Sequence, residues 1–157
     1  MIVTSNSVEH EYTIPNVRYV GQVDSFEKVA ERVQICLNSS TTFDHTYETI
    51  INSDPGSIGI TTTITQSKTV KEFTEFGVDL STSGLTAESF TAWDDLEEDQ
   101  VLQWAFDADT DEKTRIQNEQ EAKVLEAKDK ILNPKKYYRD TPVTPWRARA
   151  DAESAAE

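Results

Sequence analysis

The sequence predicts an α+β fold, in which a small antiparallel β module is followed by two α-helices and an extended C-terminal arm. Residues 12–91 are rich in Val, Ile, Thr, Tyr and Phe and are punctuated by Gly, Asn and Asp, a composition typical of short strands joined by turns. After Trp93 the chain is charged and contains no glycine, which favours helices. We expect a β module with an N-terminal arm over 1–93, a helical pair packed on it in the same domain over 94–133, and the arm with an acidic tail over 134–157.

The clearest strand is Ile58–Thr65, because its isoleucines share one face and threonines fill much of the other. The preceding run Asn52–Gly56 is a strong turn signal, so residues 45–51 and 58–65 are expected to form a hairpin. The apolar spacing of Phe26–Leu37 fits both a strand and a helix, and its β-branched residues favour the strand.

Apolar spacing after Trp93 predicts a first helix whose acidic residues crowd its first turn. Its expected apolar positions are Leu96, Val101, Trp104, Ala105 and Ala108, and its expected N-terminal acids are Asp94, Asp95, Glu97, Glu98 and Asp99. A second helix is expected from Asp111 to Leu132, ended by Asn133-Pro134. Its apolar stripe is thin and consists of Ile116, Val124, Ala127 and Ile131. Such a helix would be marginal alone, so we expect it to lie across the β module or against a neighbouring subunit.

The charge balance is strongly acidic, with 29 Asp and Glu against 15 Lys and Arg and a net charge of -14. This charge opposes docking on nucleic-acid phosphates and on anionic membrane surfaces. The start, Met1–Ser7, has neither the positive flank nor the apolar run of a signal peptide, and no apolar run is long enough to span a bilayer. We therefore expect neither a nucleic-acid partner nor a membrane partner.

The chain has one cysteine, Cys36, so it cannot form an intramolecular disulfide or a thiolate metal cluster. Its neighbours Ile35 and Leu37 indicate a small buried hydrophobe, and one unpaired thiol fits synthesis in a reducing cytoplasm.

No residue pattern points to catalysis, a metal or a cofactor. The only histidines, His10 and His45, belong to no metal-spaced pair or recognisable nucleophile constellation, and with 5 glycines a phosphate-binding loop is poorly supported. The run Asp107–Asp111 begins like a calcium-binding loop. However, Glu112 and Asn118 stand where that loop needs a glycine and a bidentate glutamate. An interhelix loop with a helix cap is the better interpretation.

Two groups of aromatic residues are the candidate functional positions. Trp93 and Trp104 are expected to be structural anchors that link helix and sheet rather than a ligand-stacking pair. The proline-containing segment Lys135–Trp146 is expected to be extended and to have little core of its own. Its larger apolar side chains must therefore contact a groove on the body or on a partner, which makes them candidate partner-binding residues. They are Tyr137, Tyr138, Val143 and Trp146.

Three segments stand out in order along the chain: Tyr12–Val17 (YTIPNV), Phe90–Trp104 (FTAWDDLEEDQVLQW) and Thr141–Trp146 (TPVTPW). Together they resemble a small uncharacterised family encoded by tailed phages, especially those of marine bacteria. At Glu97 that family usually has Thr or Ser, which cap helices well, so here we expect the cap at Asp94 or Asp95. Residues 135–140 and the tail after Trp146 look like additions to the family pattern.

The resemblance implies a phage protein that is made in the bacterial cytoplasm and built into the virion, with other phage structural proteins as partners and several copies per particle. We therefore expect a non-enzymatic structural accessory protein, with a preference for capsid decoration or cement because acidity suits an outward-facing layer. Two alternatives remain open. One is a tail or baseplate accessory protein, and the other is a free cytoplasmic phage protein that binds a basic host factor.

Overall fold

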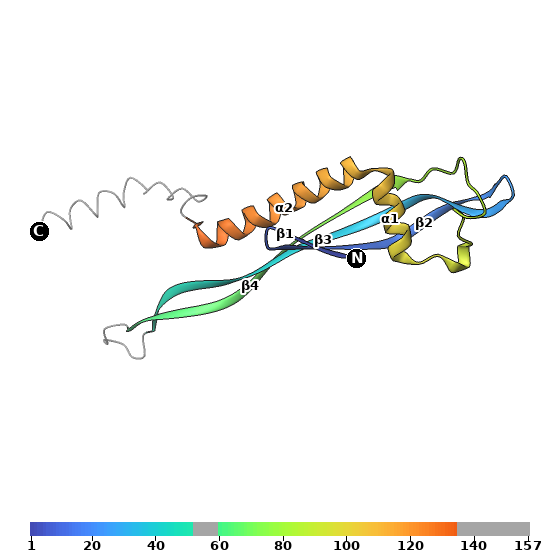
Figure 1. The fold of residues 1–157 in the computed structure, drawn as a ribbon. Coiled ribbons are helices and arrows are strands. Elements are labelled where there is room, and N and C mark those ends of the chain that lie inside the picture. The colour runs from blue at the N-terminus through green and yellow to red at the C-terminus, as the bar shows by residue number, and fades with distance from the viewer. Residues whose placement is uncertain (52–59, 135–157) are drawn as a thin grey trace, which may run out of the picture.

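The computed structural model describes residues 1–51 and 60–134, and it arranges them as four antiparallel strands in one sheet followed by two helices (Figure 1). The strands lie in the sheet in chain order, namely β1 (Ile2–Ser5), β2 (Val8–Val23), β3 (Phe26–Ile51) and β4 (Ile60–Asp79). A 3₁₀ turn (Trp93–Asp95) then leads into α1 (Glu98–Ala108) and α2 (Thr110–Leu132).

The α+β class is confirmed, as are the strand over Phe26–Leu37 and the pairing of residues 45–51 with the start of β4. The expected turn Asn52–Gly56 and the expected arm Lys135–Trp146 lie outside the described residues.

The strands are much longer than expected, with 16 residues in β2, 26 in β3 and 20 in β4. They also start at Ile2 rather than near Tyr12 and end at Asp79. Residues that commonly form turns, such as Asn38 and Asp44, lie inside β3, where each is paired with a residue of β4. Because pairing satisfies the backbone groups of these residues, the tertiary setting outweighs their weak strand preference.

The turn between β1 and β2 is a tight two-residue connection that the sequence analysis missed. Ser5 pairs with Val8, and the two residues between them, Asn6 and Ser7, have φ values of 48° and 65°. The type I′ turn, one of the two-residue turns whose twist matches that of paired strands, requires positive φ at both central positions, and asparagine tolerates this conformation better than most residues. The short first hairpin is therefore set by local turn chemistry.

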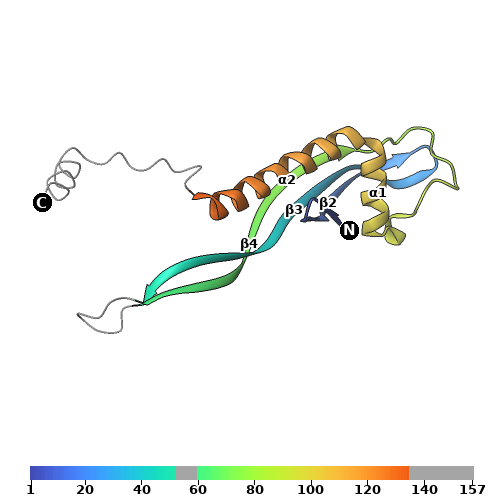
Figure 2. The same cartoon turned by 60° about the vertical axis from the view of Figure 1, so that its left-hand side comes forward.

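The core lies between the two helices and one face of the sheet (Figures 1 and 2). Side chains alternate between the faces of a strand, and Val33, Ile35 and Leu37 of β3 are fully buried on the helix side. Their antiparallel partners lie on the same face, so β2 and β4 contribute Tyr12, Phe76 and Val78 to this cluster. The helices add Val101, Leu102, Ala105, Phe106 and Ile116.

The first helix begins later than expected. Its N-cap is Glu97, whose side chain makes no capping hydrogen bond, so the expected cap at Asp94 or Asp95 is wrong. Those two residues form the preceding 3₁₀ turn, which an extended Leu96 separates from α1. Ala108 is exposed, whereas two positions that were not anticipated, Leu102 and Phe106, are buried.

The second helix begins one residue before the expected start and ends at the expected Leu132. Ile116 and Val124 are buried as expected, but Ala127 and Ile131 are only half-buried. Two polar residues, Gln120 and Glu121, are buried with them. Half of the buried positions of α2 are therefore polar, which explains why its apolar stripe is thin in sequence. Neither helix in the described part of the chain is long and apolar enough to cross a membrane.

Leu102 is the sharpest test of this core. It has no exposed surface, so Leu102→Ala should lower the free energy of unfolding by about 2–5 kcal/mol through lost apolar burial and the cavity left behind. Leu132→Ala is the matched control, because Leu132 is 41% exposed and its truncation should have little effect. Chemical denaturation of both variants measures the difference, and equal stability in the two would contradict the packing described here.

Candidate functional site

The expected partner-binding residues Tyr137, Tyr138, Val143 and Trp146 lie outside the described residues, so their positions stay a prediction. The two expected anchors are half-buried at the rim of the core. Trp104, on α1, packs against the buried cluster from its edge. Trp93, in the 3₁₀ turn, lies edge-on to the ring of Tyr19 on β2, with ring centroids 4.7 Å apart.

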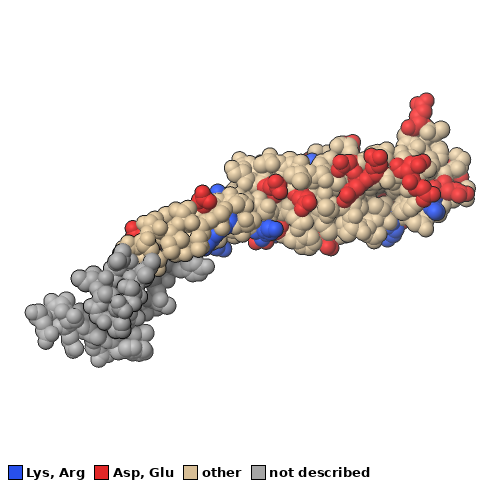
Figure 3. Space-filling model, turned by 90° about the horizontal axis from the view of Figure 1, so that it is seen from below, with Lys and Arg blue, Asp and Glu red and all other residues tan. Residues whose placement is uncertain are grey.

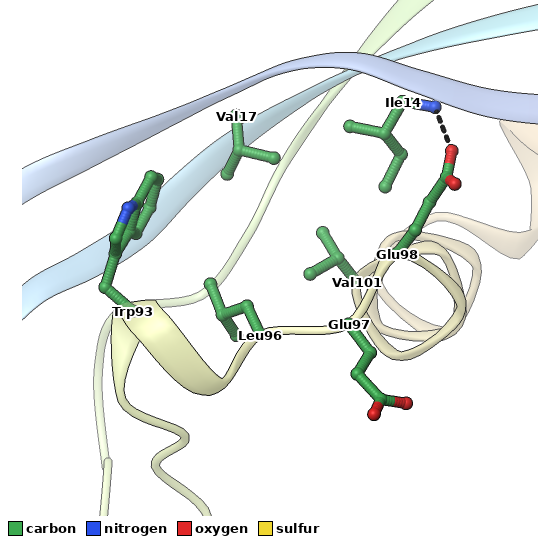
Figure 4. Close-up of a pocket in the computed structure, with 7 residues that line it drawn as sticks. All are labelled: Ile14, Val17, Trp93, Leu96, Glu97, Glu98 and Val101. Carbon is green, nitrogen blue, oxygen red and sulfur yellow. Dashed lines mark hydrogen bonds between the residues drawn. The ribbon is translucent and has the colours of Figure 1, made fainter.

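An open groove of about 360 Å³ lies between β2 and the segment that leads into α1 (Figure 4). Five of its seven lining residues are apolar, and Figure 4 shows these side chains pointing toward one another, although more of its exposed surface is polar than apolar. The lining residues are Ile14, Val17, Trp93, Leu96, Glu97, Glu98 and Val101.

The two acids of this groove are not directed at its centre. The carboxylate of Glu98 accepts the backbone N–H of Ile14 at 2.8 Å, which ties α1 to β2. The side chain of Glu97 points away from the cavity (Figure 4). The groove therefore combines apolar side chains with polar surface, and neither acid points into it.

A buried polar cluster under α2 brings together residues that the sequence analysis did not connect. Ser39 Oγ lies 2.8 Å from His10 Nδ1, and Glu121 Oε2 lies 3.5 Å from His10 Nε2. Asn6 donates from its side-chain amide to the other oxygen of Glu121. The order Ser, His, Glu is that of a hydrolase triad, but these residues come from two strands and a helix and have no sequence spacing that could reveal them.

This cluster is sealed. The side chains of His10 and Ser39 have no exposed surface, so a substrate carbonyl cannot approach Ser39 Oγ in this conformation. Nε2 of His10 has no hydrogen-bond partner among the described residues, since its 3.5 Å contact to Glu121 is long for a hydrogen bond. The geometry supports a structural role, in which hydrogen bonds satisfy some of the polar groups that α2 buries against the sheet, while His10 Nε2 and Gln120 Oε1 stay unpaired among the described residues.

The ionised form of Glu121 is favoured in the fold. The hydrogen bond from Asn6 lowers the pKa of the carboxyl group below its ordinary value, burial opposes this shift, and Ser5 and His10 lower the pKa further. A second link joins the same elements, because the Tyr12 hydroxyl donates to Gln117 Oε1 at 2.8 Å. Burial raises the pKa of Tyr12 to about 12, so this hydroxyl keeps its proton at neutral pH.

The calcium-loop-like run forms the junction of α1 and α2. Asp109 caps α2 by accepting the backbone N–H of Glu112 at 3.0 Å, which confirms the cap interpretation. Asp107 instead accepts from Gln103 on its own helix at 2.8 Å. Within residues 1–51 and 60–134, no group of three or more His, Cys, Asp or Glu side chains could hold a metal ion.

Cys36 is buried in the sheet, as expected, on the face opposite the helices. Burial raises the pKa of its thiol, and a contact with the Glu75 carboxylate at 3.5 Å raises it further. The thiol is therefore poorly disposed to ionise or react.

Beyond the core, β3 and β4 continue as a two-stranded ribbon, which we define as residues 42–51 paired with 60–69. The pairing of β2 with β3 stops at Glu9–Ser40, so within the described sheet the ribbon has no third strand. Figures 1 and 2 show it projecting from the body, away from α1. At its root, the Lys128 ammonium of α2 lies 5.3 Å from the centre of the Phe43 ring.

The outer face of the ribbon is rich in threonine. Two hydroxyl pairs cross the strands at 2.9 Å, Thr42–Thr69 and Thr46–Thr65, and all four residues are exposed. Figure 3 shows acidic side chains spread over the broad body, whereas the narrow ribbon carries few charged groups. The face in view thus divides into an acidic body and a projection with fewer charges, and the charged residues of the ribbon are Asp44, Glu48 and Lys68.

The comparisons with known proteins identify a family but no activity. A family described as a domain of unknown function (DUF7936) matches residues 7–146, and the chain belongs to it. No curated protein matches the chain, and no solved structure does.

The Glu121 cluster predicts a pH-dependent contribution to stability. Glu121→Gln should lower the free energy of unfolding near neutral pH by about 1–3 kcal/mol, because charge-assisted hydrogen bonds are lost. Since the folded-state pKa is lowered, this contribution is complete above the ordinary value of 4.5 and is lost as the pH falls through the folded-state pKa. Denaturation of both proteins over this range measures it. A difference that stays constant well below pH 4.5 would refute the role given to the carboxylate.

Proposed function

We propose that this member of the DUF7936 family is a non-enzymatic structural accessory protein of a tailed-phage particle, with a preference for a decorating or cementing role on the capsid exterior. The particle context rests on the resemblance of three segments, Tyr12–Val17, Phe90–Trp104 and Thr141–Trp146. The observation that carries the structural role is the ribbon of residues 42–51 and 60–69.

The ribbon supports an assembly function because it adds little to the fold of its own chain. Its outer face is exposed, and in the described structure neither of its strands has a second neighbouring strand. A two-stranded ribbon is marginally stable in water, and its open edges carry unpaired backbone groups that another chain can satisfy. Such a projection is stabilised most when a strand of a partner pairs with its open edge.

The rest of the surface is consistent with this role. The triad-like cluster around His10 is sealed from solvent, and five of the seven residues that line the groove between β2 and α1 are apolar. The net charge of -14 opposes contact with packaged DNA and clumping of particles, which suits an outward-facing layer.

Purified particles of the phage that encodes this chain provide the test. We expect quantitative mass spectrometry to find the protein in hundreds of copies per particle, the order expected for a capsid layer, because capsid symmetry repeats each surface contact many times. A copy number near a dozen would favour the tail or baseplate instead. Absence from particles would overturn both structural roles and favour a cytoplasmic protein that binds a basic host factor.

The C-terminal segment provides a second test of the same proposal. Deleting residues 135–157 removes the expected anchor Tyr137, Tyr138, Val143 and Trp146 and starts after the end of α2. If the segment anchors the protein to a partner, the truncated chain should fold normally and be missing from particles. Normal incorporation would contradict the anchor. A truncated chain that fails to fold would instead indicate that the segment packs on its own body.

A further inference from the structure

The outer edge of β4 is protected near the body and unprotected along its distal part, Ile60–Ser67. β4 is the last strand of the described sheet. Proteins usually guard such edges with charged side chains, proline or bulges. The part of β4 near the body is guarded by Lys68, Lys71, Glu72, Glu75 and Asp79.

The distal part of β4, Ile60–Ser67, reads Ile-Thr-Thr-Thr-Ile-Thr-Gln-Ser and has neither charge nor proline. Its β-branched residues favour an extended strand. Among residues 1–51 and 60–134, β3 is the only strand with which this segment forms backbone hydrogen bonds. The segment therefore presents a free strand edge that can accept another strand.

The edge of β3 in the same ribbon differs in charge. Asp44 and Glu48 are exposed there, on the same face as the threonines. Pairing two copies of this strand would bring carboxylates close together, which is unfavourable. Because the β3 edge carries carboxylates and the distal β4 edge carries no charge, two copies of this chain would pair more favourably through β4 than through β3.

We propose that Ile60–Gln66 of β4 pairs antiparallel with the same segment of a second copy of this chain, across a two-fold axis at Thr63. Residues directly opposite in an antiparallel pair lie on the same face of the sheet. This register places Thr63 opposite the partner's Thr63 and Thr61 opposite the partner's Thr65. The threonine rows that already form hydroxyl pairs within one ribbon thus continue across the interface.

This pairing also removes the main weakness of the ribbon. Two two-stranded ribbons become one four-stranded sheet, which satisfies the free backbone groups of both β4 edges. No charged residue of Ile60–Ser67 has to be desolvated, because the segment has none.

The geometry explains how two acidic chains can associate. In the antiparallel arrangement the two bodies lie at opposite ends of the joined ribbons. Eight residues separate Thr63 from Lys71, so each body begins about 27 Å from the axis at ~3.4 Å per residue. Charges on the two bodies are then several times farther apart than the Debye length of about 8 Å at physiological ionic strength. Repulsion between the bodies is therefore largely screened.

The observations favour a second copy of this chain, rather than a strand of another protein, as the partner of the free β4 edge. A foreign partner of an acidic protein would be selected by charge, and Ile60–Ser67 has no charge with which to select one. In the proposed register a like segment places threonine opposite threonine at Thr61, Thr63 and Thr65, and its remaining pairs, Ile60–Gln66 and Thr62–Ile64, bring no charge together. This inference does not depend on the presence of a phage particle.

Sedimentation analysis of the purified full-length chain tests the proposal. The molar mass should rise toward twice that of the monomer as concentration increases. Thr63→Lys places two ammonium groups opposite each other at the axis, where Glu48 on β3 offsets part of their repulsion, so the dissociation constant should rise about fivefold. Thr42→Lys is the matched control, because it makes the same change at an exposed threonine of β3 whose hydroxyl partner, Thr69, lies outside the paired segment, so dimerisation should be unchanged. Circular dichroism checks that both variants fold.

Disulfide trapping tests the register independently. In a Cys36→Ala background, Thr63→Cys should form an intermolecular disulfide, because directly opposed antiparallel residues have Cα atoms about 4.5–5.5 Å apart. Thr46→Cys should not form an intermolecular disulfide.

A wild-type chain that stays monomeric at every concentration would overturn the proposal and favour pairing with a strand of another protein. A dimer that Thr63→Lys does not weaken, or that Thr63→Cys does not cross-link, would place the interface elsewhere.

Discussion

The structure depends on β3, the longest strand, which pairs with both of the other long strands. Its backbone is hydrogen-bonded to β2 on one side and to β4 on the other, and its alternate residues Val33, Ile35 and Leu37 are fully buried beneath the helices. A shift of one residue in its register would move this apolar row to the uncovered face and place polar side chains in the core. Burial thus fixes the register where the helices lie, and the backbone pairing carries the same register outward into the ribbon.

The attachment of α2 shows how a weakly apolar helix is held in place. Only Ile116 and Val124 are apolar among its buried residues, and the other two, Gln120 and Glu121, are polar. Hydrogen bonds compensate, since Asn6 bonds to Glu121 and Tyr12 bonds to Gln117. Buried polar groups of this kind contribute little net stability when they are satisfied, but leaving one unpaired is costly. They therefore select one position of the helix along the sheet.

The body and the ribbon have different physical properties, and a protein that works through its surfaces needs both. The body contains the core, the helices and most of the charge, so it supplies stability and keeps other acidic surfaces at a distance. The ribbon has few charges and open strand edges, so it can associate where the body cannot. In the proposed particle, this separation would let several copies bind while their bodies face solvent.

The α+β class, the two helices and the hairpin around the start of β4 could be predicted because each rests on local periodicity or turn chemistry. The apolar repeat of Ile116 and Val124 is one example, and the alternation of Ile60 and Ile64 with threonines is another. Strand lengths could not be predicted, since Asn38 and Asp44 favour turns locally and are held extended by partners far away in the chain. The cap at Glu97 was missed for a similar reason, because the position of Leu96 depends on packing.

By itself the sequence determined the acidic charge, the order of strands and helices, and the positions where the chain can turn, because these follow from residue type and short-range spacing. Only the tertiary structure decided that His10, Ser39 and Glu121 meet, that they are sealed from solvent, and that β3 and β4 extend beyond the core as an open-edged ribbon. Contacts between residues 29 or 111 positions apart leave no periodic pattern. An open edge, moreover, is a property of the whole sheet, because it depends on where the neighbouring strand ends.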